Sequence, residues 1–216
     1  CVTRRQRQMC IRDSNTTVES FSVTVTDNEA PTATCAADFT VQLDANGAAT
    51  ITAAQINNGS TDNCTADNDL TLAISPSSFD CTDVGTNTVT LTVTDESGNS
   101  STCTTTVTVA DSIDPTAVCQ NITVELDANG AATITAAQVN NGSSDNCTAA
   151  NALTLSIDQS TFDCTDVGTP VTVTLTVEDE AGLTDTCEAI VTVTDTLAPT
   201  AVCQNITVEL DANGAA

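Results

Sequence analysis

TVTLTVTD, residues 88–95, alternates threonine with three apolar residues. Alternation with a period of two places the apolar side chains on one face of an extended chain, which is typical of a half-buried β-strand. CTTTVTV (residues 103–109) and VTVTLTVED (residues 171–179) follow the same pattern. No stretch shows a sustained helical period, and no apolar run is long enough to span a bilayer. The sequence therefore predicts an all-β protein.

These strands belong to a tandem repeat. Pro31, Pro115 and Pro199 lie 84 residues apart, and residues 43–55 recur without change as residues 126–138. A fixed period of this length identifies the folding unit. We expect two complete repeats at 31–114 and 115–198, the last strand of a preceding repeat at 15–30, and the start of a following repeat at 199–216.

Residues 1–14 match nothing in the repeat and contain all four basic residues of the chain. We interpret them as a non-native leader that takes no part in the fold; a genuine basic linker is the alternative. Separately, the partial repeats at 15–30 and 199–216 lead us to expect that the sequence is a piece of a longer array of repeats.

From Asp13 onward the chain has no Lys or Arg, and it carries 29 acidic residues in all. Nucleic acids and acidic membrane surfaces are poor partners for such a chain, because binding them begins with basic side chains. The chain also lacks His, Trp and Tyr. Without His, Lys or Tyr, a carboxylate pair is the only plausible catalytic chemistry, and identical repeats seldom each carry an active site. We therefore expect no enzyme.

Strand patterns recur several times within each repeat. The DANG turn at 44–47 suits a tight turn with positive φ, which predicts a hairpin between its flanking strands. About seven short strands in roughly 84 residues fit an immunoglobulin-like β-sandwich. In the first repeat we expect strands near 32–43, 48–53, 70–75, 78–82, 88–94 and 101–109.

Four cysteines in each complete repeat allow three disulfide pairings. We favour a bond between the opening and closing strands, because Cys103 shares the inward face of Val107, and a second bond that pins the long loop. A zinc site is disfavoured, since there is no C-x-x-C pair and no His. Disulfides imply an oxidising place outside the cytoplasm. The expected bonds are Cys35–Cys103, Cys64–Cys81, Cys119–Cys187 and Cys147–Cys164.

The motifs APTATC, TDNCT and FDCTDVGTNTVTLTVTDESGNSSTC of the first repeat, with their partners DPTAVC and SDNCT in the second, resemble the hyalin repeat (HYR) family. The resemblance covers nearly all of 15–216. It departs from the pattern in the second repeat, where Leu183 replaces the residue equivalent to Asn99. The resemblance implies an immunoglobulin-like fold, an extracellular adhesive or structural role, and no catalytic activity.

Following the expected strand directions, the loop 54–69, the turn 95–100 and the incoming linker meet at one pole of each repeat. Several carboxylates and amide oxygens without a nearby cation suit Ca²⁺, which would stiffen the joint between repeats. Turn residues in contact with solvent are the alternative interpretation, because Asp, Asn and Gly favour turns for backbone reasons alone. The candidate ligands are Asp27, Asp62, Asn63, Asp95, Glu96 and Asn99, then Asp111, Asp114, Asp145, Asn146, Asp179 and Glu180, and Asp195 at the next joint.

Two linkers contain the tripeptides DSI and DTL. They resemble an O-glycosylation tripeptide of some bacteria, which makes Ser112 and Thr196 candidate modification sites.

The leading functional hypothesis is a secreted or cell-surface structural or adhesive protein that forms a stalk, fibre or filament with calcium-stiffened junctions. Its partners would be neighbouring repeats and identical chains, together with surface glycans or proteins. The alternative is a non-catalytic spacer or ligand-binding module of a large secreted enzyme.

Overall fold

The computed structural model describes residues 22–215. Within these residues the chain divides into two compact units: one ends at Asp114 and also contains residues 145–149, and the other contains residues 115–144 and continues from Ala150. The first unit thus holds one repeat plus a short loop that belongs, by sequence, to the next repeat. The expected leader, the first part of the 15–30 segment, Cys1 and Cys10 lie outside the described residues.

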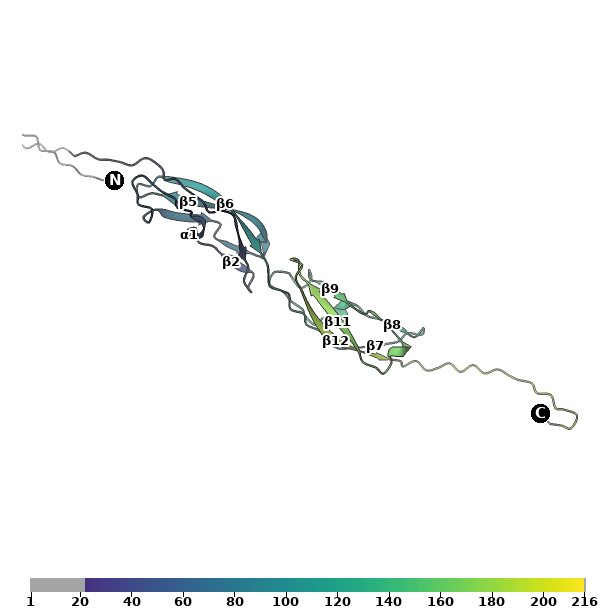
Figure 1. Cartoon of the computed structure of the whole chain (residues 1–216). Helices are drawn as coiled ribbons and strands as arrows, with labels where there is room; N and C mark the ends of the chain where they lie inside the picture. The colour runs from purple at the N-terminus through teal and green to yellow at the C-terminus, as the bar shows by residue number, and fades with distance from the viewer. Residues whose placement is uncertain (1–21, 216) are drawn as a thin grey trace, which may run out of the picture. The chain divides into compact units, whose positions relative to one another are not determined.

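The first unit is a β-sandwich (Figure 1). Its larger sheet has the order β1-β6-β5-β3, and its smaller sheet pairs β2 with β4. β1 pairs with β6 in parallel, while the other pairs are antiparallel. Its elements are β1 (Phe39–Gln42), β2 (Ala48–Thr50), α1 (Ala53–Ile56), β3 (Thr71–Ser75), β4 (Ser78–Asp80), the 3₁₀ turn η1 (Cys81–Asp83), β5 (Gly85–Thr94) and β6 (Ser100–Ala110).

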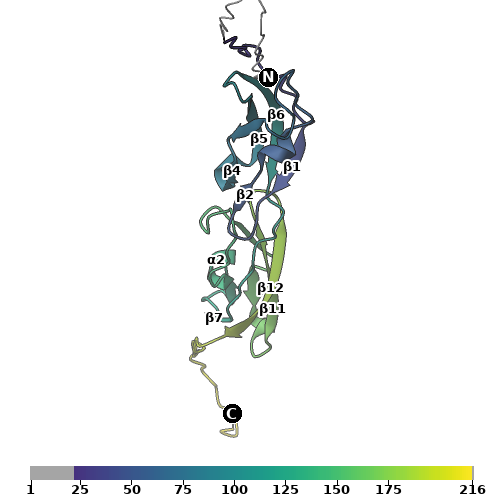
Figure 2. The ribbon, with the colours of Figure 1, turned by 90° about the vertical axis from the view of Figure 1, so that its left-hand side faces the viewer.

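The second unit repeats this topology, with the sheets β7-β12-β11-β9 and β8-β10. The long strands β11 and β12 lie side by side (Figure 2). Its elements are β7 (Ile122–Glu125), β8 (Ala131–Thr133), α2 (Ala136–Val139), β9 (Thr154–Ile157), β10 (Thr161–Asp163), η2 (Cys164–Asp166), β11 (Val171–Glu178) and β12 (Thr184–Thr194).

The core lies between the two sheets of each unit. Val89, Leu91 and Val93 of β5 are fully buried, as the alternation predicts. Phe79 of β4 packs into the same cluster from the smaller sheet, together with Ile56 of α1. The all-β, immunoglobulin-like prediction is confirmed, because the two sheets close over one apolar layer.

The expected hairpin is wrong in one respect. The chain does turn at the DANG motif, where the Asp44 N–H donates to the Ala48 carbonyl over 2.9 Å. However, β1 pairs with β6 and β2 pairs with β4, so the two flanking strands belong to different sheets. The turn carries the chain from one layer of the sandwich to the other.

The first expected strand is shorter than predicted. Only residues 39–42 form a strand, and the stretch before it makes isolated bridges, Thr32 with Thr61 and Cys35 with Asn57. Residues 22–30 and 199–215 contain no strand. They have no neighbouring strand to pair with among the described residues.

Two of the four predicted disulfides are confirmed and two are wrong. Cys35 bonds to Cys103 and Cys119 bonds to Cys187. The third bond joins Cys81 to Cys147, so neither Cys64–Cys81 nor Cys147–Cys164 forms.

The reason is the length of β5. Cys81 precedes this strand. Cys64 lies near the other end of β5, because its neighbour Thr65 accepts a hydrogen bond from the Glu96 N–H, just beyond the last residue of the strand. β5 has 10 residues, which is roughly 30 Å of extended chain. Cys64 and Cys81 therefore lie at opposite ends of the unit.

No helix among residues 22–215 has the length and apolar character needed to cross a membrane.

Candidate metal site

Asp27, Asp62 and Asp95 come together in the first unit. Each offers a carboxylate oxygen that lies within 4.8 Å of those offered by the other two. Asp27 lies on the segment that enters the repeat, Asp62 on the loop between α1 and β3, and Asp95 directly after β5. The predicted meeting of linker, loop and turn at one pole is thus observed for these three residues.

The loop before β3 holds Asp62 in place through its own backbone. One carboxylate oxygen, Oδ2, accepts hydrogen bonds from the N–H groups of Thr65 at 2.7 Å and Cys64 at 2.8 Å. These N–H groups, that of Thr65 first, lower the pKa of Asp62, because they stabilise the charged form. Asp62 is therefore ionised at neutral pH.

A tight turn after β5 holds Asp95, whose side chain is 5% exposed. Its Oδ1 accepts the Asn99 N–H at 2.7 Å and its Oδ2 accepts the Asn99 side-chain amide at 2.8 Å. The same amide also lies 3.3 Å from the backbone carbonyl of Asp27. Asn99, a predicted ligand, thus connects the turn to the entering segment by donating hydrogen bonds with its nitrogen.

Two oxygens of this cluster have no partner. Oδ2 of Asp27 and Oδ1 of Asp62 are buried and accept no hydrogen bond, although the other oxygen of Asp27 accepts the Glu29 N–H. A buried, unpaired carboxylate oxygen is costly. No Lys or Arg occurs among the described residues, so no side chain can neutralise the three charges. The donor set is hard oxygen, which fits Ca²⁺.

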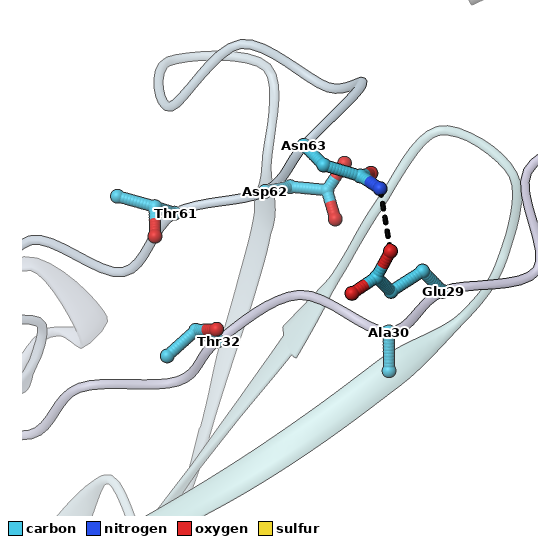
Figure 3. Close-up of a pocket in the computed structure, with 6 residues that line it drawn as sticks. All are labelled: Glu29, Ala30, Thr32, Thr61, Asp62 and Asn63. Atoms are coloured by element: carbon cyan, nitrogen blue, oxygen red, sulfur yellow. Dashed lines mark hydrogen bonds between the residues drawn. The ribbon is translucent and has the colours of Figure 1, made fainter.

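An open pocket of about 290 Å³ adjoins this cluster (Figure 3). Asp62 and Asn63 line it from the loop, and Glu29 lines it from the entering segment. The Asn63 amide donates a 2.7 Å hydrogen bond to a Glu29 carboxylate oxygen. Sequence reasoning missed Glu29, and its position two residues after Asp27 is the only signal that could have found it. Glu96 is exposed and contributes its backbone N–H to Thr65.

The repeat-equivalent residues make the same local bonds in the second repeat. Oδ2 of Asp145 accepts the N–H groups of Cys147 and Thr148 at 2.8 and 2.7 Å, and its Oδ1 is buried without a partner. Oδ1 of Asp111 accepts the Asn146 amide at 3.2 Å. Asp114, by contrast, is exposed.

Asp179 shows what the sequence departure at Leu183 does. Its Oδ1 accepts the Leu183 N–H at 2.8 Å, as the equivalent aspartate of the first repeat does from Asn99. Leu183 has no side-chain amide, so Oδ2 of Asp179 stays buried and unpaired. Leucine at this position therefore leaves Oδ2 of Asp179 without the side-chain hydrogen bond that Asn99 donates to Asp95 in the first repeat. Asp179 itself is 5% exposed.

The remaining predicted positions are exposed. Asp195 accepts the Leu197 N–H at 3.0 Å, in a local turn of the linker. Ser112 and Thr196, the candidate glycosylation sites, are exposed, and Glu180 is exposed on the turn after β11.

Residues 26–109 match the family model of the HYR domain. No curated protein sequence matches the chain. Among solved structures, protocadherin gamma B7 extracellular cadherin domains 1–4 align with 90% of this chain at 16% identity and a TM-score of 0.40, and the chain spans 58% of that structure.

Human protocadherin-24 EC1-2 aligns with 78% of this chain, over 100% of its own length, at 15% identity and a TM-score of 0.41. The fibronectin(III)-like modules of Clostridium thermocellum CbhA align with 60% of this chain and 73% of their own, at 11% identity and a TM-score of 0.28. Likenesses at these scores bear on neither the ligands nor the partners of this chain.

Proposed function

We propose that the chain, whose residues 26–109 match the family model of the HYR domain, is an extracellular structural or adhesive repeat protein whose carboxylate clusters bind Ca²⁺. The role is non-catalytic. The observation that carries the calcium proposal is the pair of buried, unpaired oxygens on Asp27 and Asp62, inside a group of three carboxylates.

Calcium at this cluster would join three separate segments of the chain. Asp27 belongs to the entering segment, Asp62 to the loop before β3 and Asp95 to the turn after β5. Without a cation the three like charges repel one another, which loosens the entering segment. When Ca²⁺ is bound, each carboxylate is attracted to the cation, and the entering segment is held against the domain. Calcium binding at this cluster would thus stiffen the segment that enters the repeat.

The sequence repeat extends the proposal to the second HYR-like repeat. Asp111, Asp145 and Asp179 are the equivalents of the first three ligands and make matching local hydrogen bonds. Calcium at every repeat would give a stiff array, suited to a stalk or filament whose partners are neighbouring repeats, identical chains, or surface glycans and proteins.

The disulfides support an extracellular place. Three bonds form within the described residues, and such bonds persist in oxidising compartments. The chain also offers no Lys or Arg after Arg12, so trypsin-like proteases find no site in the repeats.

Thermal unfolding with calcium and after chelation tests the proposal. A ligand that binds only the folded state stabilises it by about 2.7 kcal/mol at a hundredfold excess over Kd, so Ca²⁺ should raise the Tm by several degrees and EDTA should reverse the rise. Asp62→Asn keeps an oxygen for the backbone hydrogen bonds but removes the charge. We expect the calcium-dependent rise of the first unit to be lost in this variant.

Asp67→Asn is the matched control, because Asp67 is an exposed carboxylate of the same loop outside the cluster. It should keep the full response to calcium. An equal response to Na⁺ at matched ionic strength would show charge screening alone, and the calcium proposal would then be abandoned.

A further inference from the structure

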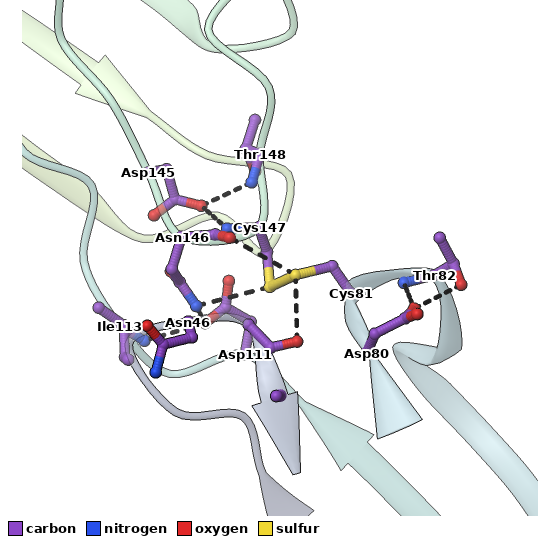
Figure 4. The surroundings of a disulfide bond; sticks show 12 residues. Asn46, Asp80, Cys81, Thr82, Asp111, Ile113, Asp145, Asn146, Cys147 and Thr148 are labelled. Atoms are coloured by element: carbon purple, nitrogen blue, oxygen red, sulfur yellow. Dashed lines mark hydrogen bonds between the residues drawn. A yellow bond between two sulfur atoms is a disulfide. The ribbon is translucent and has the colours of Figure 1, made fainter. Parts of the chain in front are cut away.

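The Cys81–Cys147 disulfide joins two repeats of the sequence (Figure 4). Cys81 lies in the first repeat, at the start of η1, and Cys147 lies in the Asp-Asn-Cys-Thr loop of the second. Residues 145–149 pack as part of the first unit. The bond therefore fastens a loop of one repeat onto a receiving surface of the repeat before it.

The receiving surface is the DANG turn together with Cys81. The Asn146 side-chain amide donates to the Asp44 carbonyl at 3.3 Å, and the Cys81 Sγ lies 3.7 Å from the Gly47 carbonyl oxygen. A Cβ on Gly47 would collide with that sulfur and would approach the Asn146 carbonyl oxygen to 3.1 Å. Glycine is thus required at position 47 for two reasons: its backbone φ is 70°, and the Cys81 sulfur approaches too closely for a Cβ.

The second unit contains the same receiving surface. Residues 126–135 repeat residues 43–52, and residues 162–169 repeat residues 79–86. The Cys164 Sγ lies 3.8 Å from the Gly130 carbonyl oxygen. A Cβ on Gly130 would lie 2.6 Å from that sulfur.

The turn that presents Cys164 is also the same. Asp163 caps η2 by accepting the Thr165 N–H at 2.7 Å, as Asp80 caps η1 by accepting the Thr82 N–H at 2.8 Å. Cys164 is exposed and forms no disulfide within residues 22–215.

We propose that Cys164 and the turn Asp127–Gly130 form a docking site for the Asp-Asn-Cys-Thr loop of a further HYR repeat, which the site binds through a disulfide. The independent observation is the equivalent cysteine, Cys81, which is bonded to such a loop beside a turn of identical sequence. The loop's asparagine would donate to the Asp127 carbonyl and its cysteine would meet the Cys164 sulfur. Successive repeats would then be cross-linked one to the next.

The bond forms by oxidation of two thiols. The Cys164 thiol and the loop thiol together lose two protons and two electrons, and a low-molecular-weight disulfide takes them up as two thiols. Equivalently, the Cys164 thiolate attacks the loop sulfur of a mixed disulfide, the new sulfur–sulfur bond forms, and the original partner leaves as a thiolate.

A peptide probe tests the docking site on the unreduced full chain. The probe has the sequence of residues 143–149, SSDNCTA, with its cysteine in a mixed disulfide with glutathione. A second probe has alanine in place of its Asp and Asn. Mass spectrometry after proteolysis reports the site of coupling, and Cys203, another exposed thiol, serves as the internal reference.

The docking site predicts that the SSDNCTA probe couples to Cys164 roughly fivefold faster than the alanine probe, the equivalent of one net hydrogen bond, while Cys203 reacts equally with both. Gly130→Ala should abolish the preference. Gly142→Ala is the matched control, because it also has a positive φ of 85° but its Cβ would meet nothing within 4 Å. Equal coupling of both probes to Cys164, or an internal Cys164–Cys203 disulfide in the isolated chain, would overturn the proposal.

Discussion

Single aspartates in this protein act mainly on the backbone beside them. The carboxylate of Asp44 accepts the N–H groups of Ala48 and Asn46 at 3.0 and 2.8 Å, which lower its pKa, that of Ala48 first. The pKa of Asp127, its equivalent, is lowered in the same way. A chain with no basic side chain in its repeats therefore stabilises its carboxylates with peptide dipoles.

These lowered pKa values make stability depend on pH. A carboxylate whose folded-state pKa lies below its unfolded value of about 3.9 contributes stability above that pH, and the contribution is lost as pH falls through the folded-state pKa. We predict that Asp44→Asn lowers the Tm at pH 7 and that the difference from the parent chain shrinks below about pH 4. Thermal unfolding across this range measures both.

Asp67→Asn controls for the general effect of removing one negative charge from an acidic chain. Its Tm should be equal to or above that of the parent at pH 7, since it removes repulsion without removing these hydrogen bonds. A constant difference between the Asp44 variant and the parent from pH 7 to pH 3 would contradict the assignment.

The ligand positions of the first cluster could be predicted from residue type and strand direction, because Asp27, Asp62 and Asp95 lie where linker, loop and turn must meet. The details could not. Which oxygen of each carboxylate is already satisfied depends on turn geometry, and the contact of Asn63 with Glu29 depends on where an irregular segment passes. Sequence alternation carries no information about either.

Strand β5 contributes three fully buried side chains to the core of the first unit. Leu91 is fully buried at the centre of β5, opposite Cys103 in the ladder. Leu91→Ala should lower the free energy of unfolding by about 3 kcal/mol, from lost burial and the cavity left behind. Val84→Ala, at a side chain that is 50% exposed, should change it by less than about 0.5 kcal/mol. Chemical denaturation measures both, and similar effects for the two variants would argue against this core.

The Cys35–Cys103 bond joins the start of the repeat to the closing strand across 68 residues. Closing a loop of that size is worth about 4 kcal/mol in the chain-entropy account. The double variant Cys35→Ser with Cys103→Ser should lose roughly that amount, as read from denaturant midpoints with other disulfides intact. A loss below about 1 kcal/mol would contradict a stapling role.

At the scale of elements, the sequence predicts β5 and β6 well because their alternation spans many residues. It fails where long-range geometry decides. The DANG motif specifies a turn but not whether the next strand pairs with the previous one. The short helix α1 was missed, although Thr52 and Gln55 form a capping box that the sequence TAAQ displays.

The disulfide map tests the whole covalent framework. We predict that digestion of the unreduced chain and mass spectrometry recover Cys81 linked to Cys147, beside the two bonds within repeats. Peptides linking Cys147 to Cys164 would restore the pairing expected from spacing alone and would remove the basis for docking between repeats. Spacing could not distinguish these because the 84-residue period places an equivalent cysteine in every repeat.

Calorimetric titration of the chelated chain with CaCl₂ measures whether the Asp27, Asp62 and Asp95 carboxylates bind calcium. We expect saturable binding in the parent chain, reduced by one site in Asp62→Asn and unchanged in Asp67→Asn. Absence of calcium binding by the parent chain, or the same number of sites in the parent and the Asp62 variant, would contradict it.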